Sequence, residues 1–250
     1  MFLDRLIEAQ RETGGRLCVG LDPQSGSVDE VRETVRRVIE ETREHACAYK
    51  PNSAFFEALG PRGADVLAET IRWVHAVDRP ALLDAKRGDI ASTAEAYARA
   101  AFDVLGVDAI TVVPYMGEDA IRPFLERGGT VFVVVLPSNA SAARVVEHGS
   151  PPLFLRVTEL AAEWAREYPG RVGLVVGATR FELARKVHDA APDLPWLVPG
   201  LGAQGGDVRA FEGAVQHEIL VYNVSRGVFA ASSPREAARR WKEEIGAGGR

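Results

Sequence analysis

A chain of 250 residues, 46% hydrophobic and 26% charged, is long enough to bury one large core or two small ones. The formal net charge is −5 and no block of basic residues is present, which argues against nucleic acid as the main partner. The N-terminal segment is charged throughout, unlike a signal peptide, and the longest strongly apolar run, Val131 to Leu136, is far too short to cross a bilayer. We therefore expect a cytoplasmic protein with no membrane contact.

Eight short apolar runs recur along the chain, and each is hydrophobic almost throughout instead of alternating. That pattern is typical of strands covered on both faces in a parallel sheet. The runs are residues 17–22, 47–52, 81–86, 109–114, 130–137, 172–178, 196–202 and 219–225. The segments between them show helical periodicity, as in the apolar stripe of Val31, Val35, Val38 and Ile39.

Several expected helix starts carry Ser or Thr with Glu three residues later, the capping-box pattern. The pattern begins at Ser27, Ser92, Thr179 and Ser233, and Pro234 occupies the favoured first helical position. Eight strands that each precede a helix predict an α/β protein, a single (β/α)8 TIM barrel over residues 1–250. A doubly wound open sheet is the competing architecture. No linker rich in Pro, Gly or Ser divides the chain.

Polar residues gather where the expected strands end. The functional groups of such a barrel lie at the carboxyl ends of its strands, and the opposite face serves stability. The residues at these ends are Asp22, Lys50, Asn52, Asp84, Lys86, Ser138, Asn139, Gln204, Ser225 and Arg226. The strand beginnings show no comparable cluster, and this asymmetry indicates an enzyme.

The segment RPALLDAKRGDIAST, residues 79–93, places charges at the end of an apolar run. Asp84 and Lys86 are two apart, so on a strand both point to one face while Ala85 points to the other. We expect both charges in the mouth of the barrel, with Lys50 of the neighbouring strand beside them. A buried ammonium next to a carboxylate is tolerated only as a paired or functional group. A surface cluster of salt bridges is the alternative.

Alternating Lys and Asp side chains have a chemical use, because each charge stabilises the ionised form of its neighbours. A protonated lysine in a closed site can deliver a proton to a developing carbanion. A deprotonated lysine could instead form a Schiff base. The flanking carboxylates favour the protonated form.

The glycine-rich loop PGLGAQGG, residues 199–206, allows close approach of the backbone to a ligand, and Arg226 follows the last expected strand. Loops after the seventh and eighth strands commonly hold phosphate in this fold. An ordinary turn with a surface arginine is the alternative. None of the five histidines lies at a strand end, no zinc spacing is present, and Cys18 and Cys47 are expected to be reduced core thiols.

The motifs together resemble the orotidine 5'-monophosphate decarboxylase family, in its longer bacterial and archaeal branch. The run LDAKRGDIAST is similar to the family signature Asp-x-Lys-x-x-Asp-Ile-x-x-Thr, YKPN to its lysine on the second strand, PGLGAQGG to its phosphate loop and SRG to its phosphate arginine. The resemblance implies cofactor-free decarboxylation of a nucleotide to UMP, through a C6 carbanion protonated by Lys86.

The resemblance also implies roles for individual residues. The catalytic array is Lys50, Asp84, Lys86 and Asp89. In the family the last aspartate reaches across a dimer interface, accompanied here by Ile90 and Thr93, so a homodimer is expected. Substrate contacts are expected from Asp22 and Lys50 for the ribose, from Ser138 for the pyrimidine, from Gln204 and Arg226 for the phosphate, and from Asn52, Pro199 and Gly205 of the same motifs.

Two alternative functions are a magnesium-dependent enzyme of the same superfamily and a barrel that only binds a ligand. Magnesium-dependent decarboxylases or aldolases of sugar phosphates share the Asp-x-Lys-x-x-Asp core, but they carry a glutamate where Lys50 stands. A lysine repels a divalent cation, which prefers anionic oxygen ligands. A barrel that only binds a phosphate ligand is the other alternative, and it would leave every charged position idle at the cost of desolvating it. We therefore expect no metal and no organic cofactor.

Overall fold

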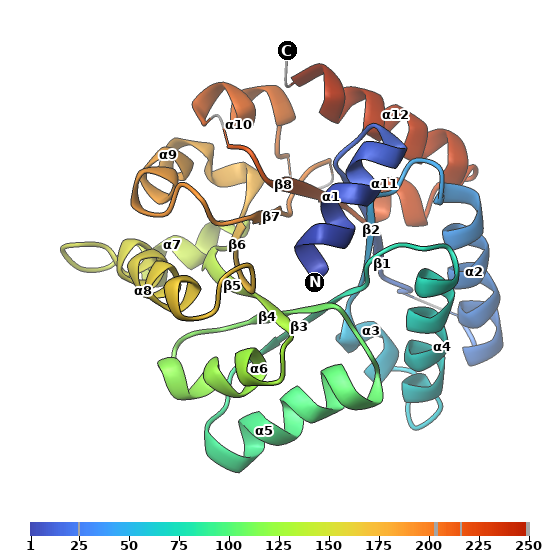
Figure 1. Ribbon diagram of the computed structural model, residues 1–250. Helices are drawn as coiled ribbons and strands as arrows, with labels where there is room; N and C mark the ends of the chain where they lie inside the picture. The colour runs from blue at the N-terminus through green and yellow to red at the C-terminus, as the bar shows by residue number, and fades with distance from the viewer. Residues whose placement is uncertain (25, 203–204, 216, 249–250) are drawn as a thin grey trace.

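A parallel sheet, curved almost into a closed barrel, forms the centre of the computed structural model, which describes residues 1–24, 26–202, 205–215 and 217–248 (Figure 1). Within those residues the sheet has eight strands in the order β2-β1-β8-β7-β6-β5-β4-β3. The strands are β1 (Leu17–Leu21), β2 (Ala48–Pro51), β3 (Leu82–Arg87), β4 (Ala109–Val112), β5 (Thr130–Leu136), β6 (Val172–Val176), β7 (Trp196–Val198) and β8 (Leu220–Val224). Isolated bridges from Tyr49 to Ala81 and from Asn52 to Asp84 join β2 to β3 and complete the ring.

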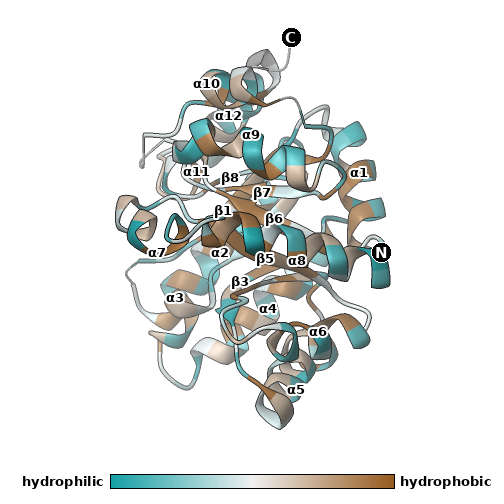
Figure 2. Ribbon diagram, turned by 90° about the vertical axis from the view of Figure 1, so that its left-hand side faces the viewer, coloured by the Kyte–Doolittle hydropathy of each residue, from teal (hydrophilic) through white to brown (hydrophobic). Residues whose placement is uncertain are grey.

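Helices connect the strands and cover the outside of the barrel (Figures 1 and 2). The α-helices are α1 (Phe2–Thr13), α2 (Val28–Thr42), α3 (Ser53–Glu57), α4 (Gly63–Ala76), α5 (Ala91–Arg99), α6 (Arg122–Glu126), α7 (Ala143–Val146), α8 (Leu153–Glu167), α9 (Phe181–Ala190), α10 (Val208–Ala214), α11 (Arg226–Phe229) and α12 (Pro234–Gly248). Shorter turns are η1 (Ala100–Val104), η2 (Glu118–Ala120), η3 (Ala140–Ala142) and η4 (Ala178–Arg180). The expected α/β barrel and its eight strands are confirmed, each strand lying within the run that predicted it or extending one residue beyond it.

The capping predictions are partly wrong. Ser27 and Glu30 form the expected capping box at the start of α2, and the Glu236 backbone N–H donates to Ser233 Oγ at the start of α12. Ser92, however, lies inside the first turn of α5, which begins at Ala91. The Thr179 hydroxyl donates instead to the backbone oxygen of Ser138, 2.7 Å away, so a tertiary contact replaces the predicted cap.

The barrel interior is apolar at its N-terminal end. Inward-facing side chains form one buried cluster, and Phe2, Leu6 and Ala9 of α1 cover this cluster at the N-terminal end of the barrel. The strand residues of this cluster are Cys18, Ala48, Leu82, Ala109, Phe132, Val175, Leu197 and Val221. Burial raises the pKa of the Cys18 thiol to about 12, so this side chain remains an uncharged core group. A larger apolar cluster fills the space between strands and helices, where the strands are brown in Figure 2.

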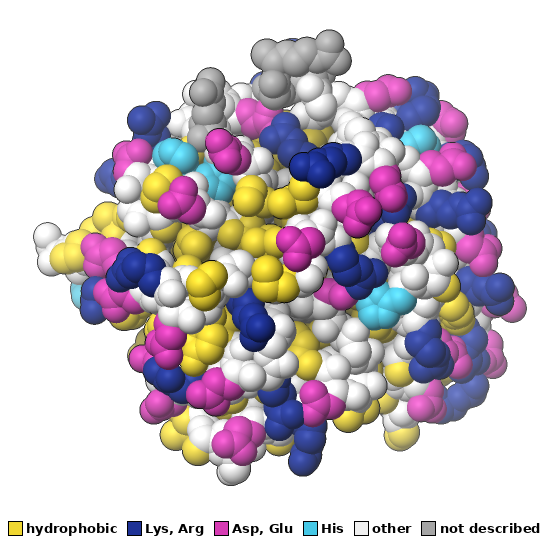
Figure 3. Space-filling model, in the orientation of Figure 1, with side chains coloured by type: hydrophobic (Ala, Val, Ile, Leu, Met, Phe, Trp, Pro, Cys, Tyr) yellow, Lys and Arg dark blue, Asp and Glu magenta, His cyan; other side chains and the backbone are white. Residues whose placement is uncertain are grey.

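Alternation along the strands places polar groups next to this apolar cluster, on the side of the carboxyl ends of the strands. The inward position two residues beyond Ala48 is Lys50, and the one two residues beyond Leu82 is Asp84. The carboxyl ends of the strands therefore present charge to the barrel mouth. On the opposite face, shown in Figure 3, basic and acidic side chains are interspersed and gather into no basic patch. None of the described helices could span a membrane.

Candidate active site

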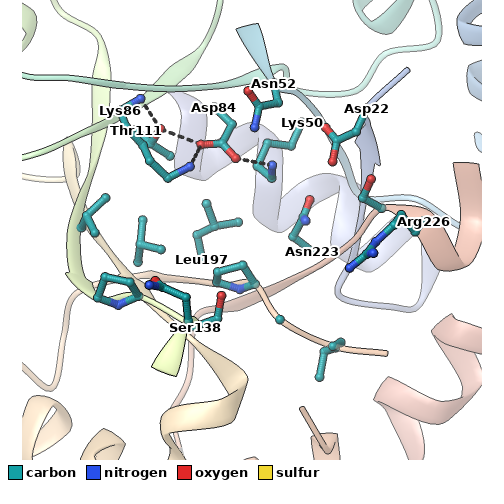
Figure 4. A pocket seen from close by; sticks show the side chains of 18 of the residues that line it. Asp22, Lys50, Asn52, Asp84, Lys86, Thr111, Ser138, Leu197, Asn223 and Arg226 are labelled. Carbon is teal, nitrogen blue, oxygen red and sulfur yellow. Dashed lines mark hydrogen bonds and ion pairs between the residues drawn. The ribbon is translucent and has the colours of Figure 1, made fainter. Parts of the chain in front are cut away.

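A cavity of about 440 Å³ opens at the carboxyl ends of the strands (Figure 4). Its size lies in the range of about 300–1,000 Å³ that is usual for small-molecule sites. The structure brings eight of the predicted site residues to its wall: Asp22, Lys50, Asn52, Asp84, Lys86, Ser138, Pro199 and Arg226. The polar residues predicted from separate strand ends thus share one cavity.

The charged array is centred on Asp84. Its Oδ2 is 2.6 Å from Lys50 Nζ, and its Oδ1 is 2.5 Å from Lys86 Nζ. The Thr111 hydroxyl donates a third hydrogen bond to Asp84 Oδ1 over 3.0 Å. Each carboxylate oxygen is therefore bound to an ammonium group, as the dashed lines in Figure 4 show. The expectation that the two lysines flank this aspartate is confirmed.

The two lysines differ in exposure. The Lys50 side chain is 4% exposed and that of Asp84 10%, whereas the Lys86 side chain is 50% exposed. Burial by itself would lower the pKa of Lys50, but the charges of Asp84 and Asp22 outweigh it and raise that pKa. Burial would likewise raise the pKa of Asp84, yet the two ammonium groups lower it. Both Lys50 and Asp84 are therefore ionised, and Lys86 reaches the open part of the cavity.

The backbone conformation at the end of β3 is not the regular strand that alternation alone predicted. Lys86 has a φ of +47°, in the left-handed region, and the pairing of β3 with β4 shifts register between Leu83 and Arg87. Thr111 on β4 supports the irregularity, since its Oγ1 accepts hydrogen bonds from the backbone N–H groups of Ala85 (3.1 Å) and Lys86 (3.0 Å). Sequence reasoning missed Thr111, although its position two residues beyond inward-facing Ala109 would have indicated it.

The side of the cavity where phosphate binding is expected is lined by Pro199, Gly200 and Leu201 of the glycine-rich loop and by Arg226. The loop folds back on itself, with the Gly206 N–H donating to the oxygen of Gly200 over 3.0 Å. A Cβ at Gly206 would lie 2.6 Å from that oxygen, so only glycine permits this approach. Arg226 is exposed at the start of α11, and within the described residues no carboxylate is paired with it. Gly205 does not reach the cavity wall, and Gln204 lies outside the described residues.

The indole of Trp241, on α12, packs against Gly202 of the glycine-rich loop and against Gly227 of α11. A Cβ added at Gly202 would be 3.0 Å from its Cζ2, and one added at Gly227 would be 2.8 Å from its Nε1. The glycine-rich loop and α11 therefore both pack against Trp241. No sequence pattern singled out Trp241, because it belongs to a helix far along the chain from the loop.

Asp89, Ile90 and Thr93 do not line the cavity of their own chain. They follow β3, where the Asp89 carboxylate accepts a hydrogen bond from the Ile90 N–H over 2.8 Å. Ile90 is 49% exposed, and Thr93 is also exposed. Among the described residues, no three His, Cys, Asp or Glu side chains converge in a manner that could hold a metal ion.

Comparisons with known proteins agree on one family. A sequence model described as "Orotidine 5'-phosphate decarboxylase / HUMPS family" matches residues 15–241. The orotidine 5'-phosphate decarboxylase of Herpetosiphon aurantiacus is 44% identical, over 96% of this chain and 94% of that protein. The protein of the same name from Thermomicrobium roseum is 42% identical, over 98% and 94%. The structure of Leishmania donovani OMP decarboxylase, 42% identical, matches with a TM-score of 0.91 and covers 99% of this chain and 98% of that one.

Proposed function

The chain belongs to the orotidine 5'-phosphate decarboxylase / HUMPS family, and from that membership we propose that it converts orotidine 5'-monophosphate to UMP and CO2 in pyrimidine biosynthesis. The observation that carries the proposal is the Lys50–Asp84–Lys86 array at the mouth of the barrel. It places a fixed carboxylate beside a partly exposed ammonium group. That combination suits a reaction that expels CO2 and leaves a carbanion to be protonated.

Lys50 favours this reaction over the magnesium-dependent chemistry of sugar-phosphate relatives. Its ammonium group is buried and bound to Asp84, where a metal site would need another anionic ligand. The positive charge of Lys50 would repel a divalent cation bound next to it, and no additional anionic ligand at that position would offset the repulsion. The array thus supplies its own positive charges, and we propose that no metal or organic cofactor takes part.

The substrate has a natural orientation in the cavity. Its phosphate would lie at Arg226 and the glycine loop, because Arg226 provides a charge-assisted donor there. The pyrimidine would then extend toward Lys86, with Ser138 at its edge and the C6 carboxylate near Asp84. When the C6–CO2 bond breaks, the electron pair stays on C6 and receives a proton from Lys86 Nζ. Lys86 is half exposed, so it can regain a proton from solvent once the product leaves.

We propose that the active unit is a homodimer in which Asp89 acts in the neighbouring cavity. Asp89 lies outside the cavity of its own chain, next to the exposed Ile90. Further large apolar side chains are exposed nearby, Tyr97 at 38% on α5 and Tyr115 at 86% on the segment that leads into η2. Since α5 packs against η2, these side chains belong to one region of the surface. A second copy of the chain would cover them and bring Asp89 to the partner's site.

The direct test is decarboxylation of orotidine 5'-monophosphate by purified protein, followed by the loss of orotate-nucleotide absorbance, with and without EDTA. We expect turnover that EDTA leaves unchanged, because Lys50 provides the positive charge that a metal would otherwise supply. No turnover would overturn the proposed function. Activity that EDTA abolishes and magnesium restores would overturn the cofactor-free mechanism and favour the metal-dependent alternative.

Arg226→Ala is expected to weaken UMP binding by roughly 10- to 150-fold, the range of a charge-assisted hydrogen bond. Binding of uridine, which lacks the phosphate, should change far less. Calorimetric titration of both ligands checks the difference, with Arg36→Ala, an exposed change on α2, as the matched control. Equal losses for UMP and uridine would contradict a phosphate role for Arg226.

A further inference from the structure

Thr111 is the residue of β4 that faces the irregular stretch of β3. The pairing of the two strands is regular up to Leu83 and resumes at Arg87, so residues 84–86 of β3 lie opposite Thr111 alone. An irregularity of this kind leaves backbone groups of the longer strand outside the regular ladder. N–H groups that are withdrawn from water then need another acceptor, because the loss of their bonds to water is otherwise uncompensated.

The Thr111 hydroxyl provides that acceptor, and its three hydrogen-bonding capacities are all used. Its Oγ1 accepts from the N–H groups of Ala85 (3.1 Å) and Lys86 (3.0 Å), and it donates to Asp84 Oδ1 over 3.0 Å. A hydroxyl has one proton to donate and two lone pairs. Since the two N–H groups occupy the lone pairs, the proton is directed at Asp84. Thr111 is buried, so water does not compete for these bonds.

These contacts close a ring that begins and ends at Lys86. Its backbone N–H donates to Thr111, Thr111 donates to Asp84 Oδ1, and Lys86 Nζ donates to the same oxygen over 2.5 Å. The ring connects the backbone of Lys86 to the tip of its own side chain. The φ of Lys86 is +47°, which residues other than glycine rarely adopt, and the bond to Thr111 holds the backbone there. Figure 4 shows the three side chains side by side at the cavity wall.

Resting on the proposed function, we propose that Thr111 is a positioning residue that fixes the Asp84 carboxylate and the Lys86 ammonium group for proton transfer to C6. When Lys86 gives up its proton, its neutral amine loses the ionic attraction to Asp84. Thr111 and Lys50 still donate to that carboxylate, so it stays in place until Lys86 regains a proton from solvent. A misplacement of about 1 Å can slow a reaction roughly 100-fold, so the hydroxyl should affect kcat more than ligand binding.

The test compares Thr111→Val and Thr111→Ser with the wild type. Valine has the shape of threonine without the hydroxyl, so Thr111→Val should lower kcat for orotidine 5'-monophosphate by about 10- to 100-fold. The dissociation constant of UMP should change by less than about threefold, since the interaction acts in the transition state. Thr111→Ser retains the hydroxyl and should restore kcat to within about threefold of wild type. Thr158→Val on α8 is the matched control, because it removes another buried hydroxyl, which donates to the Phe154 oxygen over 2.8 Å, and should leave kcat unchanged.

A second readout does not depend on turnover. In the crystal structure of Thr111→Val, Lys86 should leave the left-handed region or its Nζ should separate from Asp84, whereas Thr111→Ser should keep both features. Near-normal kcat in Thr111→Val, or a loss that Thr111→Ser does not restore, would refute the positioning role while the proposed function stands. No turnover by wild-type protein would refute the proposed function, and unchanged Lys86 geometry in Thr111→Val would refute the role of Thr111. Thr111→Ala removes the same hydroxyl and carries both comparisons should the valine variant fail to fold.

Discussion

Replacing Lys86 by alanine is expected to lower kcat for orotidine 5'-monophosphate by roughly 10⁴-fold or more, since a general acid and an electrostatic stabiliser are lost together. Decarboxylation leaves an electron pair in an orbital in the plane of the pyrimidine ring, which the ring π system cannot delocalise. Stabilisation must therefore come from outside the ring. The ammonium group of Lys86, 2.5 Å from the Asp84 carboxylate and half exposed to the cavity, is placed to supply it.

Binding of UMP should survive the Lys86→Ala change within a few-fold, because the residues expected to bind phosphate and sugar lie elsewhere in the cavity. Single-turnover kinetics and calorimetric titration of UMP separate the two effects. Lys86→Arg provides a sharper comparison: arginine keeps the positive charge but does not give up a proton. It should therefore recover part of the electrostatic stabilisation and little of the proton transfer. Lys186→Ala, an exposed change on α9, is the matched control.

Isotope transfer gives an independent readout of the same mechanism. In deuterated water the wild-type protein should place one deuterium at C6 of UMP, because Lys86 exchanges its protons with solvent before each turnover. Near-normal kcat in Lys86→Ala would exclude this lysine as the proton donor. A lysine adduct trapped by borohydride would indicate Schiff-base chemistry instead.

The second large effect is expected from mixing two inactive variants. Lys86→Ala and Asp89→Ala should each be inactive as homodimers, yet mixed dimers would contain one site with intact Lys86 from one chain and intact Asp89 from the other. With random exchange of subunits, half of the dimers are mixed and one site in each is complete, so about a quarter of wild-type activity should return. The rate of the equimolar mixture, relative to each variant alone, is the measurement.

Subunit exchange has to be shown in the same experiment, by tagging one variant and isolating mixed dimers. Asp29→Ala, an exposed carboxylate on α2, serves as the control partner in place of Asp89→Ala. Its own homodimers should be active, so its mixture with Lys86→Ala should show only the activity of its own chains. Proven exchange without recovered activity would show that Asp89 does not act across the interface.

Much of the fold and of the cavity was determined by the sequence alone. The eight apolar runs predicted the eight strands because a strand that is buried on both faces must be apolar almost throughout, which is a local property of the chain. The charges at the ends of those runs predicted the cavity wall for the same reason, since parallel strands bring their carboxyl ends to one edge. Lys50 and Asp84 follow directly from the alternation of inward-facing positions above Ala48 and Leu82.

Only the tertiary structure decided how the groups are held. The left-handed backbone at Lys86 is held by hydrogen bonds that the N–H groups of Ala85 and Lys86 donate to Thr111 Oγ1, on another strand. Thr179 does not cap its helix because its hydroxyl donates a hydrogen bond to the backbone oxygen of Ser138, which is far away in the chain. Asn223 Oδ1 is buried without a hydrogen-bond partner among the described residues, and no local pattern in the sequence reveals which buried acceptors lack one. Periodicity determines which face of an element is buried, but the partner of each polar group depends on which distant segments the fold brings next to it.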